Sequence, residues 1–134
     1  MNKNAEDFVK QWLAKANEDL LVVEKLTEDE IIATSSVCFH CQQAVEKFLK
    51  AFLIANDIDA RKTHNIEYLL SECSDVDNDF TTIDPKGLSD FGVDARYPGD
   101  MYIPDNTETL EYKRIALEIK EVVEDKIYRI FRKS

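Results

Sequence analysis

Apolar residues recur at steps of three and four along most of the chain, which is the spacing that places them on one face of a helix. Four stretches carry this pattern. They are Phe8, Trp12, Ala16, Leu20 and Val23; Cys41, Ala44, Val45, Phe48, Ala51 and Phe52; Ile66, Leu69 and Leu70; and Ala116, Ile119, Val123, Ile127 and Ile130. The second stretch also has an outward polar side, to which we assign Gln43, Glu46, Lys47 and Lys50.

Glycine and proline are concentrated in one part of the chain. All six of these residues fall between positions 85 and 104. Since they are the strongest breakers of regular structure, long helices are expected before this region and one further helix after it. No strand-like alternation is found. The pattern predicts one all-α domain over residues 1–134, an antiparallel up-and-down helical bundle with two or three long helices and shorter connecting helices.

Capping residues indicate where the helices begin. The expected starts are a capping box at Thr27 and Glu30, an N-cap at Thr63, an N-cap at Asp84 followed by Pro85, and a last start at Asp105 with Glu108 three residues on.

The charge balance restricts the class of partner. The net charge is −10, from 17 Lys and Arg against 27 Asp and Glu. Broad nonspecific binding to nucleic acid depends on basic residues and is therefore not expected, although a local basic site is compatible with this balance. No apolar leader and no membrane-length apolar run is found, and three cysteines without signs of export indicate reduced thiols in the cytoplasm.

Cys38, His40 and Cys41 lie within four positions and resemble part of a metal site. On a helix, however, His40 points away from the two cysteines, and a tetrahedral zinc site needs four ligands. Cys41 also falls within the apolar stripe. We interpret the cysteines as small core residues and expect no metal and no cofactor.

A second apparent metal motif is the acidic run from Asp75 to Asp79. It imitates the start of a calcium loop, but Phe80 and Lys86 stand where that loop needs Gly and Glu. A solvated acidic loop is the better interpretation.

Two histidines are candidates for chemistry, and each keeps an alternative. His40 lies at the edge of the polar face near Gln43 and Lys47, either as a boundary residue or as a catalyst. His64 is placed in the first turn of a helix, where the helix dipole favours anions. It is either part of an anion site or an ordinary surface residue at a helix start.

The stretch "DARYPGDMY" supplies the third candidate. Tyr97 precedes Pro98 and is biased to an extended conformation, so that Arg96 projects from a helix end. Arg suits bidentate recognition of phosphate or carboxylate, whereas an ion pair with Asp94 or Asp100 is the alternative.

Three segments together resemble the HEPN family: "FHCQQAVEKFLKAFL", "KTHNIEYLL" and "ARYPGD", in that order. The resemblance extends from about Trp12 to Ile130. It implies a small helical bundle, usually dimeric. Many members resemble ribonuclease toxins of toxin–antitoxin pairs, in which Arg and His separated by four to six residues act at a dimer cleft. Others are noncatalytic and accompany a minimal nucleotidyltransferase or bind nucleotides.

The chain departs from the ribonuclease pattern, because both histidines precede Arg96 and only two residues separate Arg61 from His64. We therefore expect a noncatalytic module that acts as a homodimer and binds a partner protein, with a minimal nucleotidyltransferase as the candidate. The expected site for a nucleotide-like anion comprises Arg96, Tyr97, His64, Lys47, Gln43 and His40. The alternative is a ribonuclease with a nonstandard Arg/His arrangement.

Overall fold

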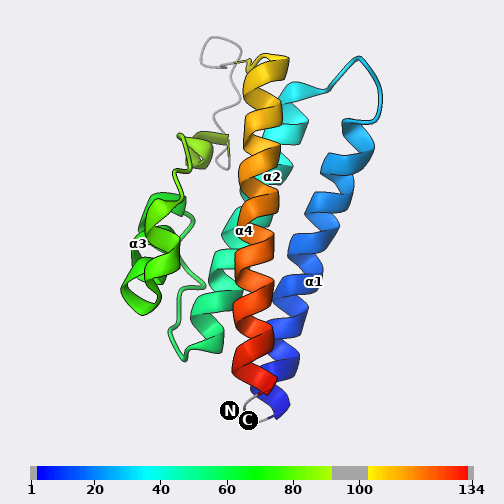
Figure 1. Cartoon of the computed structure of the whole chain (residues 1–134). Coiled ribbons are helices and arrows are strands. Elements are labelled where there is room, and N and C mark those ends of the chain that lie inside the picture. The colour runs from blue at the N-terminus through cyan, green and yellow to red at the C-terminus, as the bar shows by residue number, and fades with distance from the viewer. Residues whose placement is uncertain (1–2, 92–102, 133–134) are drawn as a thin grey trace.

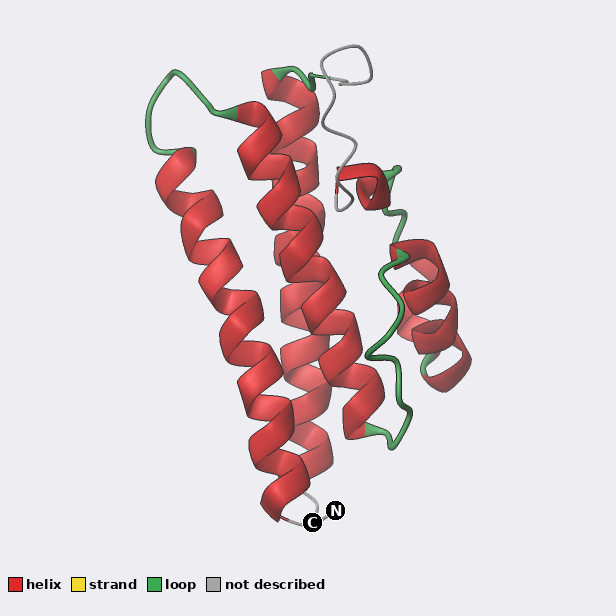
Figure 2. Cartoon of the chain, turned by 180° about the vertical axis from the view of Figure 1, so that it is seen from behind, coloured by secondary structure: helices red, strands yellow, loops and turns green. Residues whose placement is uncertain are grey.

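The computed structural model describes residues 3–91 and 103–132, and within them it is built from helices (Figures 1 and 2). The elements are α1 (Lys3–Leu26), α2 (Thr34–Ala55), α3 (Ile66–Val76), two short 3₁₀ helices η1 (Asn78–Thr82) and η2 (Leu88–Phe91), and α4 (Asn106–Arg132). The all-α prediction is confirmed.

Helix α2 is the centre of the bundle. It packs against α1, α4, α3 and η2, whereas α1 and α4 touch each other along a narrower contact. Figure 1 shows α1 and α2 running in opposite directions and α4 running in the same direction as α2. Helix α4 therefore begins at the end of the bundle where α2 begins, and α3 lies between α2 and α4 in the chain.

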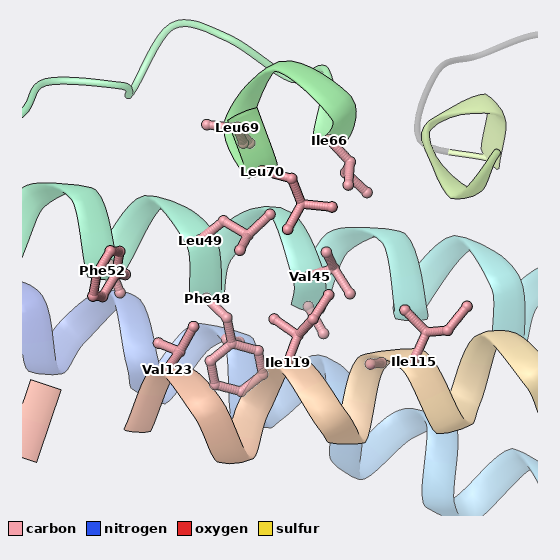
Figure 3. Close-up of a cluster of buried hydrophobic side chains, with 14 of the residues drawn as sticks. Val45, Phe48, Leu49, Phe52, Ile66, Leu69, Leu70, Ile115, Ile119 and Val123 are labelled. Atoms are coloured by element: carbon pink, nitrogen blue, oxygen red, sulfur yellow. The ribbon is translucent and has the colours of Figure 1, made fainter. Parts of the chain in front are cut away.

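The core forms where these helices meet on α2. Leu49 of α2 meets Leu70 of α3 on one side of the helix, and on the other side Phe48 points toward Val123 of α4 (Figure 3). Each of these residues is buried. The predicted apolar stripes of α2, α3 and α4 are thus confirmed, except that Ile130 is only partly buried. In α1 the stripe is correct from Ala16 onward, whereas Phe8 is exposed.

Three of the predicted helix starts are wrong. Thr27 does not begin a helix, because its hydroxyl donates to the carbonyl of Val23 and so satisfies the last turn of α1. Helix α3 is capped by Asn65, whose side chain accepts from the N–H of Tyr68, and not by Thr63. The residues after Asp84 form a turn instead of the expected fourth helix.

This turn has a local cause. The carboxylate of Asp84 accepts from the N–H of Lys86, and both Lys86 and Gly87 adopt positive φ angles of 51° and 78°. A helix cannot pass through such angles, so only the short η2 follows. The start at Asp105 is confirmed, since its side chain accepts from the N–H of Glu108 at 2.7 Å.

Candidate site on the polar face of helix α2

Six polar side chains of α2 lie along one side of the helix, and we call this set the α2 polar face. It comprises His40, Gln42, Gln43, Glu46, Lys47 and Lys50. Partners for these side chains come from α1 and from the segment between α2 and α3. Within this set Glu46 and Lys50 are buried, which corrects the prediction that they point outward to solvent.

Glu46 is the centre of the first cluster. Its Oε2 lies 3.0 Å from the Nζ of Lys50 and 3.0 Å from the Nδ1 of His64, and its Oε1 accepts from Gln42 at 3.1 Å. Lys50 also donates to the carbonyl of Arg61 at 3.0 Å. The buried charges are therefore compensated by each other and by a backbone group, as a low-dielectric site requires.

These contacts set the ionisation of Glu46. Burial alone would raise the pKa of its carboxyl, but the hydrogen bonds from His64, Lys50 and Gln42 outweigh burial and hold the pKa below its ordinary value. Glu46 is therefore a carboxylate at neutral pH. It orients the imidazole of His64 through Nδ1, and His64 itself is largely exposed, so its Nε2 can face a ligand.

Asp19 of α1 is the centre of a second cluster. Its Oδ1 lies 2.9 Å from the Nδ1 of His40, and its Oδ2 accepts from the Nζ of Lys47 at 2.6 Å. Asp19 is buried, while His40 and Lys47 are partly exposed. The arrangement repeats that of the first cluster: one buried carboxylate holds one lysine and one imidazole.

Two glutamines lie between the clusters. Gln43 donates to Gln42 at 2.6 Å, and Gln42 in turn donates to Glu46. Trp12 of α1 borders the face at its lower end, where the Nζ of Lys50 lies 5.6 Å from the centre of the indole ring.

The structure brings together four of the six residues expected to form the site. His40, Gln43 and Lys47 lie on the α2 polar face, and His64 joins it through Glu46. Arg96 and Tyr97 lie outside the described residues.

His64 was expected to lie in the first turn of a helix and to form part of an anion site there. The structure differs from this expectation in two respects. His64 precedes Asn65, the N-cap of α3, and is not in the first turn. The N–H of Ile66 donates to the hydroxyl oxygen of Ser89 at 2.7 Å, and the N–H of Tyr68 donates to the side-chain oxygen of Asn65. These two N–H groups are therefore not available to an anion.

Sequence reasoning missed Asp19, Gln42, Glu46 and Lys50 as members of the site. Gln42, Glu46 and Lys50 recur every four residues on a helix that is otherwise mostly apolar, and this spacing is a signal that could have indicated a buried polar row. Nothing in the local sequence links Asp19 to His40, because the pair depends on the packing of α1 against α2.

The described part of the face is charge-balanced and not basic. Lys47 is held by Asp19, and Lys50 by Glu46. The imidazoles of His40 and His64 are likewise each held by a carboxylate, through Nδ1.

The two apparent metal motifs have structural roles. Cys38, Cys41 and Cys73 are buried free thiols, which confirms the interpretation of Cys41 as a core residue. Burial raises the pKa of Cys41 to about 12, so the thiol stays protonated. In the acidic run, Asp77 and Asp79 both bind the Nζ of Lys126 at 2.7 Å.

One pocket of about 280 Å³ lies near the site but not on it. It is lined by Ile58, Asp59, Ala60, Lys62, Thr63, Tyr68 and Glu72. Of these lining residues, Asp59 forms an ion pair with Arg61, which is not part of the lining. Separately, no described helix combines the length and the apolar character needed to cross a membrane.

Comparison with known proteins identifies the family. No match to the chain was found among curated proteins or among solved structures. A family model with the description "HEPN domain" matches residues 9–127. This range includes α1 from Val9, all of α2 and α3, and α4 up to Ile127. The chain with its helical bundle and its α2 polar face therefore belongs to the HEPN family.

Proposed function

We propose that the protein is a noncatalytic HEPN module that acts as a dimer, binds a partner protein and receives a nucleotide-like anion at the α2 polar face. The observation that carries the ligand part is the repeated arrangement of one buried carboxylate, one lysine and one imidazole, at Asp19 and at Glu46. Both imidazoles are held by Nδ1, which leaves Nε2 for a ligand.

The distance between the two clusters argues against cleavage of RNA within one chain. Acid–base cleavage needs proton-transferring groups close to one scissile phosphate. His40 and Glu46, which holds His64, are six residues apart on α2, a rise of about 9 Å along the helix axis. Each imidazole is held by a different carboxylate, His40 by Asp19 and His64 by Glu46, an arrangement that suits two contacts to an extended ligand better than one reaction centre.

The ligand test is calorimetric titration of the wild type with ATP, GTP and a short oligonucleotide. Loss of a hydrogen bond to a charged group typically costs about 1.5–3 kcal/mol, so Lys47→Ala and Arg96→Ala should each weaken binding by about tenfold or more. Lys25→Ala, which removes an exposed lysine at the end of α1, should leave the affinity unchanged.

Two results would contradict the ligand proposal. One is the absence of binding at millimolar ligand. The other is an affinity that neither Lys47→Ala nor Arg96→Ala changes.

The contact between Glu46 and His64 also favours a second function. A carboxylate that orients an imidazole through Nδ1 prepares Nε2 for proton transfer, as a ribonuclease would need. RNA degradation by the wild type that is lost in His64→Ala, with native helicity retained, would establish this function and overturn the noncatalytic proposal. His64→Gln is the matched variant, since it keeps a donor for Glu46 but cannot act as a base.

Family membership supports the partner proposal, with a minimal nucleotidyltransferase as the candidate. If such a protein is encoded beside this chain, co-expression should yield a complex that survives gel filtration. Separate elution of the two proteins at micromolar concentration would contradict this part of the proposal.

A further inference from the structure

An aromatic pair on α1 adjoins the α2 polar face and takes no part in the contacts described for the two clusters of that face. Phe8 and Trp12 lie about one helical turn apart, with their ring centres 6.3 Å from each other and the rings nearly perpendicular at 81°. Trp12 is partly buried against the core, whereas Phe8 is 38% exposed. The pair therefore presents aromatic surface to solvent at the edge of a polar site.

Trp12 is joined to His64 through two buried charges. The Nζ of Lys50 lies 5.6 Å from the centre of the indole ring and 3.0 Å from Oε2 of Glu46. The same carboxylate oxygen lies 3.0 Å from Nδ1 of His64. One nitrogen and one oxygen thus separate the indole from the imidazole. Because Nε2 of His64 is left for a ligand, one small molecule can reach both rings.

The register of α1 against α2 places the aromatic pair at the lower end of the polar face. The two helices run in opposite directions (Figure 1). Asp19 of α1 binds Lys47, and Trp12, seven residues earlier on α1, lies against Lys50, three residues later on α2. Residues seven apart lie on the same side of a helix. Trp12 therefore faces α2 as Asp19 does, and Phe8 lies one turn beyond it.

We propose that Phe8 and Trp12 form a base-stacking platform beside the anion site, so that the ligand is a nucleotide and not a bare phosphate or a sugar phosphate. Every nucleobase has a flat π-surface that stacks on aromatic side chains. In a nucleotide a single sugar separates the base from the phosphate, which suits the short path between indole and imidazole. The cation of Lys50 beside the indole holds this ring in position. This inference rests on the proposed function and names the class of its ligand.

The first test uses fluorescence, because Trp12 is the single tryptophan of the chain. Titration with ATP should quench its emission, since the base stacks against the aromatic pair. Tripolyphosphate, a chain of three phosphates without sugar or base, should leave the emission unchanged. Calorimetry of the same titrations should give a Kd for ATP at least about tenfold below that for tripolyphosphate, the factor expected of one stacked base.

The second test separates stacking from packing by substitution. Trp12→Leu and Phe8→Ala should each weaken the binding of ATP by about tenfold and leave the binding of tripolyphosphate unchanged. Trp12→Phe keeps an aromatic ring and should retain most of the affinity for ATP. Circular dichroism of each variant checks the helices. Phe8→Ala tests the platform independently of Trp12, because Phe8 is exposed and its loss does not open the core.

Leu21→Ala is the matched control for these substitutions. Leu21 is 57% exposed on the same helix. It lies nine residues after Trp12, a rotation that puts it on the opposite side of α1. Its replacement should leave the affinity for ATP unchanged.

The outcomes distinguish the platform from the anion site. If neither ATP nor tripolyphosphate binds, the proposed ligand function and the platform both fall. If both bind with equal affinity and the emission of Trp12 does not change, the anion site stands and the platform is overturned. The platform is also overturned if Trp12→Leu and Phe8→Ala weaken both ligands alike, or if neither variant changes the affinity for ATP.

Discussion

Phe48 illustrates how much of the fold rests on single side chains of α2. It is fully buried and points toward α4 (Figure 3). Phe48→Ala should lower the free energy of unfolding by about 3–5 kcal/mol, because it removes a large apolar group and leaves a cavity. Urea unfolding measures the change. Phe8→Ala is the matched control, since Phe8 is exposed on α1 and its loss should cost less than about 1 kcal/mol. Equal costs would show that Phe48 is not a core residue.

Glu46 makes the stability depend on pH. Its folded pKa is lowered relative to the ordinary value of 4.5, so the group stabilises the fold above that value and loses this contribution as the pH falls through the folded pKa. Glu46→Gln also leaves Lys50 without its carboxylate and should cost about 3–5 kcal/mol at pH 7.

The check is urea unfolding of wild type and Glu46→Gln between pH 7 and pH 3. The difference between the two proteins should shrink as the pH falls below about 4.5. Glu18→Gln, at an exposed position of α1, should show no such trend. A difference that stays constant over this range would contradict the assignment.

At the scale of elements, α4 depends on its N-cap. The side chain of Asp105 accepts from the N–H of Glu108, and α4 begins at the next residue, Asn106. Asp105→Ala should cost about 1 kcal/mol, the usual value for a lost cap, and lower the thermal midpoint accordingly. Asn106→Ala, one position into the helix, is the control and should have a smaller effect. If the two substitutions cost the same, the cap contributes nothing of its own.

For the whole molecule, one lysine of α4 makes two of the contacts that hold the return from α2 to α4. Lys126 of α4 binds both Asp77 and Asp79 beside η1. Lys126→Met keeps the apolar stem of the side chain and removes its charge. Since the pairs are partly exposed, the loss should be about 1 kcal/mol and should diminish in high salt.

Lys10→Met is the matched control for Lys126. Lys10 pairs with Glu6 at an exposed position of α1, so its replacement should change the stability very little. Thermal unfolding at low and high salt compares the two variants. A cost for Lys126→Met that does not depend on salt would indicate packing of the stem and not the ion pairs.

The apolar periodicity was sufficient to predict the all-α class and the buried stripes of α2, α3 and α4. These features are local, because a spacing of three and four residues fixes which side chains share a helix face. The helix starts were predicted less well. Thr27, Thr63 and Asp84 each have a side chain that can satisfy either a helix start or a neighbouring turn, and in each case the side chain bonds a backbone group two to four residues away without starting a helix.

The sequence by itself determined that this protein is a helical bundle, and it placed His40, Gln43 and Lys47 on one face of α2. Only the tertiary structure decided that Asp19 of α1 holds His40 and Lys47, and that the buried Glu46 binds both the buried Lys50 and the exposed His64. The physical reason is distance along the chain. Asp19 and His64 lie 28 and 18 residues from Lys47 and Glu46. Such pairs form only when α1 and the segment before α3 pack against α2, and no local pattern encodes them.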